Sequence, residues 1–377
     1  MAKPILMKGN EAIAEAAIRA GCRYFFGYPI TPQNEIPEYM SWRLPEVGGA
    51  FVQAESEVAS INMVYGAAGA GGRVLISSSS PGISLMQEGI SYIAGAELPC
   101  VIVNMARGGP GLGGIQPSQS DYFQATKGGG HGDYRLLVYG PSTIQEACDL
   151  MGKAFEVAEK YRNPVMILGD GMMGQMMEPV VFPEEVEASS ISAKPWATTG
   201  KKGRPANLIT SIYLDPEVLD THNWKLYEKY SLMQEHEVMY ETKYADDAEW
   251  FLVAYGTIAR ICTAVVEKLR KEGVKIGLIR PITLWPFPFE AFDQVVEHAK
   301  GFLCVEMSTG QMVEDVRLAV EGRAPVHFYG RTGGAIPMPK GIEKRVSEMI
   351  SGKTPIITDY FKKHTEVTTY EARLFAP

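Results

Sequence analysis

Three segments of the sequence carry polar side chains at positions where a ligand could bind. Thr31 lies in the run Gly-Tyr-Pro-Ile-Thr-Pro (residues 27–32), directly after a predicted strand, and the two prolines fix the backbone around it. Arg107 follows another predicted strand, where it could hold a carboxylate through two parallel hydrogen bonds or pair with an aspartate. Glu57 begins a predicted helix, where a carboxylate also serves as a simple cap. Singly, none of the three identifies a function.

The elements that carry these side chains alternate between helix and strand over residues 1–180. Short apolar runs separated by helical segments predict a parallel sheet with helices on both faces. Ligands bind such sheets at the carboxyl ends of the strands, where the loops with Thr31 and Arg107 lie. The expected strands are residues 23–26, 73–77, 99–104 and 164–168, and the expected helices are residues 11–20 (capped by Asn10), 56–70, 82–94 and 142–160.

A second α/β unit is expected over residues 248–340. Residues 181–247 between the two units are polar and rich in proline, so they are interpreted as a linker with an irregular excursion. Residues 341–377 should form one helix and a polar tail. The second unit should contain strands at residues 249–255, 275–280 and 302–305 and helices at residues 259–272 and 290–300.

Composition narrows the class of protein. The 377 residues suffice for two or three domains, and 46% hydrophobic with 21% charged residues is ordinary for a globular chain. The net charge of −8 argues against binding to nucleic acid or to an anionic membrane. No run approaches the roughly 18 apolar residues of a membrane span, and the first residues lack the apolar core of a signal peptide, so the cytoplasm is expected.

The cysteines and glycines give mostly negative predictions. No two of the five cysteines have C-x-x-C spacing, so neither a zinc site nor an iron–sulfur cluster is expected on this chain. Residues 109–114 fit the pattern G-x-G-x-x-G, but Pro117 interrupts the helix that should bind a dinucleotide phosphate. His131, in a glycine-rich loop, could approach a ligand or simply form a turn, and it stays a peripheral candidate.

Together, the segments around Thr31, Glu57 and Arg107 resemble the alpha subunits of 2-oxoacid:ferredoxin oxidoreductases. The resemblance covers nearly the whole chain and implies a pyrimidine-type thiamine-diphosphate-binding fold in residues 1–180, followed by a transketolase-C-like α/β domain. Further motifs occur in the order and approximate spacing of that family: Ser77-Ser-Ser-Ser-Pro-Gly82, Arg107-Gly-Gly-Pro110, Gln119-Ser-Asp121, His131-Gly-Asp133, Arg280-Pro-Ile-Thr-Leu-Trp-Pro286 and Glu306-Met-Ser-Thr-Gly-Gln311.

The resemblance implies a role for each of the three residues. Glu57 would hydrogen-bond N1′ of the thiamine pyrimidine and so favour the imino tautomer, whose 4′-nitrogen accepts the proton from thiazolium C2. Thr31 and Arg107 would hold the carboxylate of the 2-oxoacid. Glu55 is the rival for the activating role, and Glu57 is preferred because it aligns with the glutamate of the family. Further cofactor contacts are expected from Tyr28, Pro29, Ile30, Ser80, Gly82 and Gly108.

The same resemblance implies a divided enzyme. Gly169-Asp-Gly171 begins like the motif that binds Mg²⁺ and diphosphate, but the next asparagine is Asn207 in the proline-rich stretch, and one aspartate does not satisfy Mg²⁺. Asp170 should therefore end a strand, and no metal site is expected here. A beta subunit would supply the diphosphate and Mg²⁺ site, and [4Fe-4S] clusters would lie on that subunit and on a small ferredoxin-like delta subunit, with a gamma subunit completing the complex.

The implied reaction is oxidative decarboxylation of a 2-oxoacid to an acyl-CoA and CO₂, with electrons passing to ferredoxin and coenzyme A as co-substrate. The segment Arg107-Gly-Gly-Pro-Gly-Leu-Gly-Gly-Ile-Gln-Pro117 looks more like the branched-chain (2-oxoisovalerate) branch, with the 2-oxoglutarate branch as the alternative. Half of a different thiamine enzyme and a non-catalytic thiamine-fold scaffold are the rival classes, and iron and thiamine analysis of the native complex would separate them.

Overall fold

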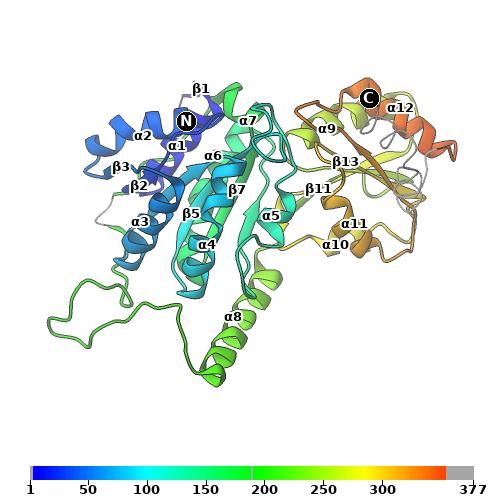
Figure 1. Ribbon diagram of the computed structural model, residues 1–377. Coiled ribbons are helices and arrows are strands. Elements are labelled where there is room, and N and C mark those ends of the chain that lie inside the picture. The colour runs from blue at the N-terminus through cyan, green and yellow to red at the C-terminus, as the bar shows by residue number, and fades with distance from the viewer. Residues whose placement is uncertain (1–2, 188–189, 354–377) are drawn as a thin grey trace, which may run out of the picture.

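The computed structural model describes residues 3–187 and 190–353. Two sheets lie beside each other, each flanked by helices, and a long helix projects from the first unit (Figure 1). The expected tail beyond residue 353 lies outside the described residues. Among those described, no helix combines the length and apolar character that a bilayer crossing requires.

The first sheet has seven strands in the order β12-β6-β7-β5-β4-β2-β3, all parallel except β12. Its central strands β4, β5 and β7 are buried along their whole length, as a parallel sheet covered on both faces requires. The strands are β2 (Tyr24–Gly27), β3 (Ala50–Gln53), β4 (Val74–Ser78), β5 (Cys100–Ala106), β6 (Leu137–Tyr139), β7 (Pro164–Asp170) and β12 (Thr283–Trp285).

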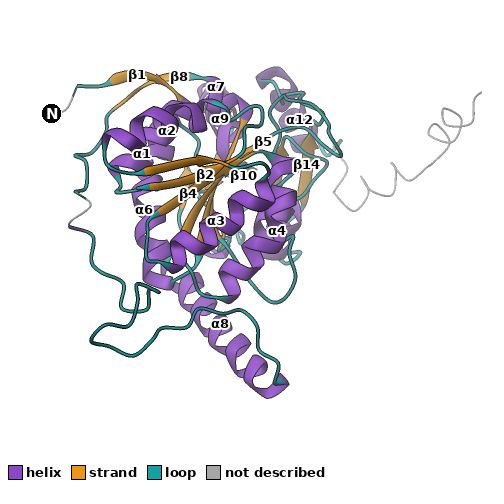
Figure 2. Ribbon diagram, turned by 60° about the vertical axis from the view of Figure 1, so that its left-hand side comes forward, coloured by secondary structure: helices purple, strands orange, loops and turns teal. Residues whose placement is uncertain are grey.

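Helices cover both faces of this sheet. On one face lie α1 (Gly9–Arg19), α2 (Glu35–Glu46) and α6 (Ile144–Tyr161), and on the other lie α3 (Glu57–Gly69) and α4 (Ser80–Gly95) side by side (Figure 2). The short helices α5 (Tyr122–Thr126) and α7 (Gly171–Gln175) follow later in the chain. The strands β1 (Ile5–Lys8) and β8 (Met177–Val180) pair antiparallel and join the two ends of this unit.

The second sheet has five strands in the order β14-β13-β10-β11-β9. The helices α9 (Gly256–Lys271) and α12 (Pro339–Ile350) pack on one face, and α10 (Phe289–Asp293) and α11 (Met312–Val320) lie on the other. The apolar core on the α10–α11 face continues without interruption into the α4 side of the first sheet, so the two units share one core. The strands are β9 (Tyr240–Lys243), β10 (Trp250–Val253), β11 (Ile276–Pro281), β13 (Gly301–Glu306) and β14 (Val326–Gly330).

The parallel architecture is confirmed, and the stretch expected as a linker with an irregular excursion also contains regular elements. Residues 181–247 contain the helix α8 (Pro216–His236), capped by Asp215, and the strand β9, which pairs antiparallel with β11. The α8 helix buries only Leu226, Tyr230 and Met233, so most of its surface stays polar or exposed and its sequence shows no continuous apolar stripe.

Other expectations fail locally. Asn10 does not cap the first helix, because that helix already begins at Gly9 and the Asn10 amide instead donates to Pro32 O and to Glu35. The helix expected at residues 290–300 ends at Asp293. Within residues 248–340, β12 crosses back to pair with β6 of the first sheet.

Candidate functional site

The predicted residues gather at the carboxyl edge of four neighbouring strands. Arg107 follows β5, Ser80 follows β4, Thr31 follows β2 and Glu57 follows β3, and these strands are adjacent in the order β5-β4-β2-β3. The fold therefore brings together segments that lie far apart in the sequence. This is the edge at which parallel α/β sheets bind ligands.

Glu57 is the first residue of α3, but it is not the cap of that helix. The Ser56 side chain fills the cap position and accepts a hydrogen bond from Ala59 N at 3.3 Å. Glu57 is only 6% exposed, whereas Glu55 is exposed, so the two glutamates face different surroundings. Among the described residues, no hydrogen bond or ion pair of the Glu57 carboxylate is found, which leaves this buried acceptor available to a ligand.

The start of α4 closes around that carboxylate. A Cβ on Gly82 would lie 2.6 Å from Glu57 Oε1 and 2.1 Å from Ser78 Oγ, so only glycine fits there. In the part of the chain that is described, the buried hydroxyls of Ser78 and Ser79 have no hydrogen-bond partner. Unpaired buried polar atoms beside a buried carboxylate form a small polar site that a nitrogen-rich ring could satisfy.

Arg107 joins two loops. Its Nη1 donates to Thr31 O at 3.0 Å and its Nη2 donates to Leu112 O at 3.1 Å, while its buried Nε has no partner among the described residues. The guanidinium forms no ion pair with an aspartate in the described chain, so that alternative is not supported. Each Nη nitrogen carries a second N–H that can still point at a ligand.

Ser80 and Gly108 hold the loop of Arg107 from both sides. The Ser80 hydroxyl accepts a hydrogen bond from Arg107 N at 3.0 Å. Gly108 is buried, donates to Gln116 O at 3.0 Å, and packs against Gly333 of the second unit, because a Cβ on Gly108 would lie 3.5 Å from that backbone. Both residues thus shape the site through the backbone.

The turn after β2 forms the outer wall. Tyr28 and Pro29 are exposed and Ile30 is half-buried, so the three residues present a surface toward solvent beside the buried Glu57. Thr31 is also exposed, and its side chain lines a cavity of about 620 Å³. The structure places these residues at the same edge as Glu57, but no printed contact joins Tyr28, Pro29 or Ile30 to it.

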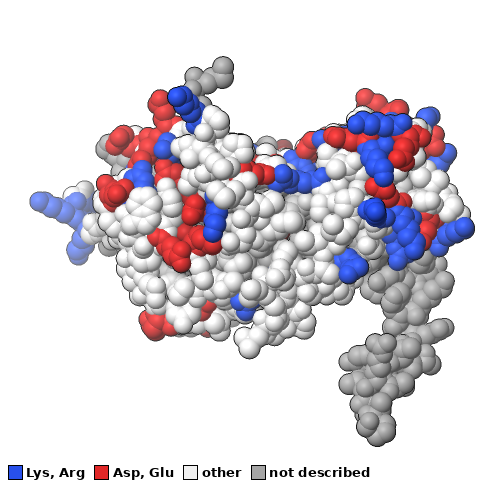
Figure 3. Space-filling view, turned by 90° about the horizontal axis from the view of Figure 1, so that it is seen from above, with Lys and Arg blue, Asp and Glu red and all other residues white. Residues whose placement is uncertain are grey.

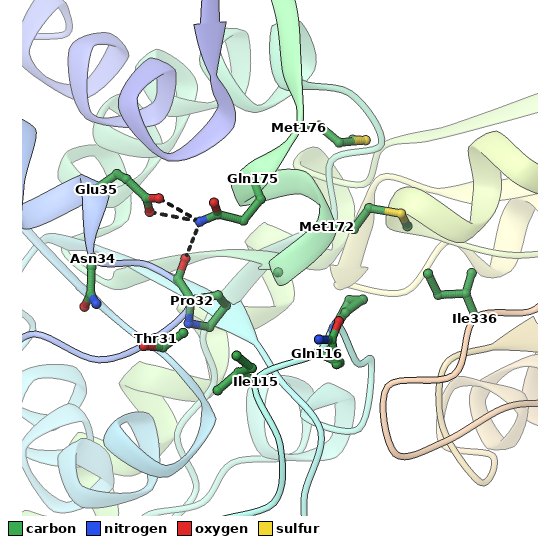
Figure 4. A pocket seen from close by; sticks show the side chains of 12 residues that line it. Thr31, Pro32, Asn34, Glu35, Ile115, Gln116, Met172, Gln175, Met176 and Ile336 are labelled. Carbon is green, nitrogen blue, oxygen red and sulfur yellow. Dashed lines mark hydrogen bonds between the residues drawn. The ribbon is translucent and has the colours of Figure 1, made fainter.

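The 620 Å³ cavity beside Thr31 is largely apolar (Figure 4). Ile115, Met172, Met176 and Ile336 line it from three segments, with Met172 in α7 and Met176 directly after that helix. Its one charged lining residue is Glu35, whose carboxylate accepts hydrogen bonds from Asn10 and Gln175. Although burial raises the pKa of Glu35, these hydrogen bonds and the one from Lys8 outweigh it, so the pKa is lowered and the group stays ionised.

Asp170, His131 and the five cysteines could suggest other functions, but the structure gives none of them a place in this site. Asp170 ends β7 as expected, and its carboxylate accepts hydrogen bonds from Met172 N, Met173 N and the Thr257 hydroxyl, so it is fully used. His131 is exposed and contacts the ring of Tyr92 on α4. All five cysteines are buried and free, and burial raises the pKa of Cys22 and Cys100 to about 12, which disfavours thiolate chemistry.

Comparison with protein families matches both units. Residues 15–242 match the family described as "Pyruvate flavodoxin/ferredoxin oxidoreductase, thiamine diP-bdg", and residues 248–342 match "Pyruvate:ferredoxin oxidoreductase core domain II". The first match spans more than half of the chain. It places Thr31, Glu57 and Arg107 inside a thiamine-diphosphate-binding family region.

Curated relatives agree with these matches. The chain is 50% identical over 347 residues to the ketoisovalerate oxidoreductase subunit VorB of Methanothermobacter thermautotrophicus, covering 91% of this chain and 97% of that protein. It is 36% identical over 377 residues to the 2-oxoglutarate synthase subunit KorA of Methanothermobacter marburgensis, covering 93% and 100%.

Solved structures support the fold. A 2-oxoglutarate:ferredoxin oxidoreductase from Magnetococcus marinus, solved with 2-oxoglutarate, coenzyme A and succinyl-CoA bound, matches with a TM-score of 0.80 at 27% identity. That match covers 92% of this chain but 65% of the Magnetococcus chain. A split-gene transketolase matches with a TM-score of 0.55 at 14% identity, which supports the fold alone. The chain therefore belongs to the pyruvate flavodoxin/ferredoxin oxidoreductase family and is a subunit of a 2-oxoacid:ferredoxin oxidoreductase.

Proposed function

We propose that this chain is the alpha subunit of an enzyme that oxidatively decarboxylates a branched-chain 2-oxoacid to an acyl-CoA, and that it supplies the pyrimidine half of the thiamine diphosphate site. The observation that carries the proposal is the buried Glu57 carboxylate, which lacks a partner among the described residues. It lies beside the Ser78 hydroxyl, which is also unpaired among those residues, and beside Gly82, which has no side chain. These groups fit an aminopyrimidine, which needs a hydrogen-bonding carboxylate and close approach of the backbone.

Each proposed residue has a defined task. The Glu57 carboxylate binds the pyrimidine N1′ and stabilises the tautomer whose exocyclic nitrogen can accept a proton. Ser80, Gly82 and Gly108 shape the pocket wall, and Tyr28, Pro29 and Ile30 shield its outer side from water. Thr31 and the free N–H groups of Arg107 hold the carboxylate of the 2-oxoacid. When bound, thiamine diphosphate supplies the carbanion and the electron sink for decarboxylation.

Burial supports the preference for Glu57 over Glu55. A carboxylate screened from water interacts more strongly with a ring nitrogen than an exposed one, because the effective dielectric is lower. Glu55 is exposed and therefore offers no such environment. Thr31 and Arg107 are already joined through the Thr31 carbonyl, which holds both of them at one side of the site.

The cavity beside Thr31 supports a branched-chain substrate. The apolar side chains of Ile115, Met172, Met176 and Ile336 suit a branched aliphatic group. A 2-oxoglutarate molecule would place its second carboxylate in this cavity, where the charged lining residue is the ionised Glu35, already paired with Lys8, and no lysine or arginine lines the cavity to bind that carboxylate. The 50% identity to a ketoisovalerate oxidoreductase subunit agrees with this preference.

The exposed side of α3 and α4 is evidence for a partner subunit, which would carry the diphosphate and Mg²⁺ half of the site. Glu57 and Glu88 are the charged residues of these two helices, and a helix that is apolar on all sides is normally buried. Figure 3 shows few charged side chains along the lower edge of that view. The large apolar side chains that remain exposed on the two helices are Val58, Met63, Leu85 and Tyr92.

A loop extends this apolar face. Residues 205–215, here called the strap, run past the lower ends of α3 and α4 before α8 begins (Figure 1). Ser211 lies against Gly95 at the end of α4, because a Cβ on Gly95 would lie 3.4 Å from Ser211 Cβ. Leu208 and Leu214 of the strap are 84% and 90% exposed. Apolar surface of this extent is typical of a protein–protein interface.

The remaining parts of the enzyme are assigned to partners. We propose that a beta subunit carries the diphosphate site with Mg²⁺. The [4Fe-4S] clusters lie on the beta subunit and on a ferredoxin-like delta subunit, and a gamma subunit completes the complex. Coenzyme A and ferredoxin are the co-substrates. The buried, protonated cysteines of this chain support the location of the clusters elsewhere. Five free thiols also suit a reducing compartment, so we propose the cytoplasm.

Reconstitution tests the proposal. The chain alone should be inactive, whereas co-expression with the beta, gamma and delta subunits should give reduction of a low-potential acceptor that requires coenzyme A and a 2-oxoacid. Turnover with 2-oxoisovalerate should exceed turnover with 2-oxoglutarate. A complex that contains no iron, or that decarboxylates without an acceptor, would identify a different thiamine enzyme, and a complex inactive with every 2-oxoacid would favour the scaffold.

A further inference from the structure

Asp121 connects two residues of the proposed site. It is a buried side chain in the Gln119-Ser-Asp121 segment, for which no role followed from the sequence. Its Oδ2 accepts hydrogen bonds from the Ser80 hydroxyl at 2.6 Å and from Asn104 Nδ2 at 2.8 Å. Ser80 begins α4 and Asn104 lies in β5, so one carboxylate oxygen joins the ends of two neighbouring strands.

The direction of these hydrogen bonds follows from the chemistry of the groups. Ser80 has one hydroxyl proton and two possible acceptors, Asp121 Oδ2 at 2.6 Å and Arg107 O at 3.3 Å. A carboxylate so close takes the proton, and the oxygen of Ser80 is then free to accept from Arg107 N at 3.0 Å. The Asn104 amide is oriented in the same way, since its Nδ2 faces Asp121 and its Oδ1 accepts from Ser80 N at 3.2 Å.

We propose that Asp121 is a positioning residue for the 2-oxoacid, which acts by fixing Ser80 and thereby the backbone from which the Arg107 side chain reaches the substrate. This inference rests on the proposed function of Arg107. The role requires a hydrogen-bond acceptor at Oδ2 and does not require a negative charge, because none of the groups that contact Asp121 is a cation. Burial raises the pKa of Asp121, which agrees with an environment that does not favour the charge.

The second unit holds Asp121 in place. The neighbouring Gln119 donates from Nε2 to Tyr255 O at 3.0 Å and accepts from Met307 N at 2.9 Å. On the other side, the Tyr122 hydroxyl donates to Asp315 at 2.6 Å. Asp121 therefore sits in a segment anchored at both ends on the second unit, and its carboxylate links that fixed position to the loop of Arg107.

The two carboxylate oxygens of Asp121 have different surroundings, so replacing this residue with asparagine is an informative test. Asp121 lines a cavity of about 680 Å³ together with Ser80 and Gly108 to Leu112. No hydrogen bond of Oδ1 is found among the described residues. In Asp121→Asn the amide oxygen can occupy the Oδ2 position, accept both hydrogen bonds, and direct its NH₂ group to the cavity. In Asp121→Ala the Ser80 hydroxyl loses the acceptor that fixes it, so the Ser80 side chain can change rotamer and move its oxygen away from Arg107 N.

Steady-state kinetics of the full complex test the inference. Asp121→Ala should raise the KM for the 2-oxoacid about 10- to 100-fold, the scale expected for a misplaced binding group, with the KM for coenzyme A unchanged. Asp121→Asn should restore the KM for the 2-oxoacid to within about threefold of the native value. In an Arg107→Gln background, Asp121→Ala should add little, because both changes act on the same interaction.

A matched control separates positioning from stability. Glu237 is a buried carboxylate that accepts from Lys160 Nζ at 2.7 Å and Tyr161 Oη at 3.0 Å, and it touches none of the site residues. Glu237→Ala should lower thermal stability and leave both KM values unchanged. An unchanged KM for the 2-oxoacid in Asp121→Ala, or equal losses in the Asn and Ala variants, would overturn the role of Asp121. If Arg107→Gln itself leaves this KM unchanged, the proposed function of Arg107 fails instead.

Discussion

The Arg107 guanidinium spans two loops through the carbonyl oxygens of Thr31 and Leu112. A planar group with several donors can hold both oxygens and still present N–H groups to a carboxylate, whereas the ammonium of lysine is a single point charge. The side chain therefore shapes the site, and in the proposed function it also provides positive charge for the substrate.

The first prediction concerns this double role. Arg107→Lys should raise the KM for the 2-oxoacid by about 10- to 100-fold, because one ammonium cannot hold both loops and the substrate. The kinetics of the reconstituted complex with varied 2-oxoacid measure this change. Arg317→Lys, on an exposed position of α11, is the matched control and should behave as the native protein does. A native KM for the 2-oxoacid in Arg107→Lys would show that the planar guanidinium is not needed for substrate binding.

Sequence patterns were sufficient to single out Thr31, Glu57 and Arg107 as candidates, since Thr31 and Arg107 follow predicted strands, Glu57 begins a predicted helix and the spacing resembles that of a known family. They could not identify Asp121 or the unpaired Ser78, because the roles of these residues depend on which strands become neighbours. They also left open whether Glu57 is a helix cap. That question was decided by the Ser56 side chain, which occupies the cap position.

At the scale of single elements, α3 and α4 are unusual because their outer sides are nearly uncharged although they face away from the sheet. Leu85 of α4 is 55% exposed, and Leu208 and Leu214 of the strap, which runs past the ends of these helices, are also exposed. Burial of such side chains contributes roughly 25 cal/mol for each Å² of apolar surface removed from water. A partner that covers this face would therefore be held mainly by apolar contact.

The second prediction is that charge on this face prevents assembly. Leu214→Glu and Leu85→Glu should leave the isolated chain folded, because both side chains are exposed, but should lower the amount of complex recovered with the beta subunit. Size-exclusion chromatography with light scattering measures that amount. Leu318→Glu is the matched control, since Leu318 is 61% exposed on α11, away from this face. Equal recovery of all three complexes would exclude the face as the docking surface.

Elements were predictable where the apolar pattern was strong. The buried strands β4, β5 and β7 and the amphipathic helices α6 and α9 lie within a few residues of their expected positions. The helix α8 was missed because its first half is exposed, although Asp215 and Pro216 are a common start of a helix. The short strands β9 and β12 were missed because their pairing partners lie in distant parts of the chain.

On the scale of the whole molecule, the two units are interwoven. The chain leaves the first unit through α8, enters the second sheet at β9, and returns to the first sheet at β12. Gln119 lies at the junction, where its side chain bonds the backbone of Tyr255 and Met307. The shared apolar core and these buried hydrogen bonds indicate that the two units unfold together.

The third prediction follows from this junction. Gln119→Ala leaves one buried N–H and one buried carbonyl without a partner. Because each unsatisfied group costs about 1–3 kcal/mol, the free energy of unfolding should fall by roughly 2–6 kcal/mol. Urea denaturation followed by circular dichroism measures the change. Gln145→Ala, which removes hydrogen bonds at an exposed position, should cost less than about 1 kcal/mol. A cost for Gln119→Ala no larger than that control would contradict a stabilising role of these hydrogen bonds at the junction.

Activation of the cofactor by Glu57 is tested most directly by the rate at which the thiazolium C2 proton exchanges with deuterium in the assembled complex, measured by quenched-flow NMR in the absence of 2-oxoacid. Glu57→Gln preserves the shape of the side chain but removes the proton acceptor, and should slow the exchange by about 10²- to 10⁴-fold. Glu55→Gln should exchange at the native rate. Equal rates in Glu57→Gln and the native complex would contradict the account.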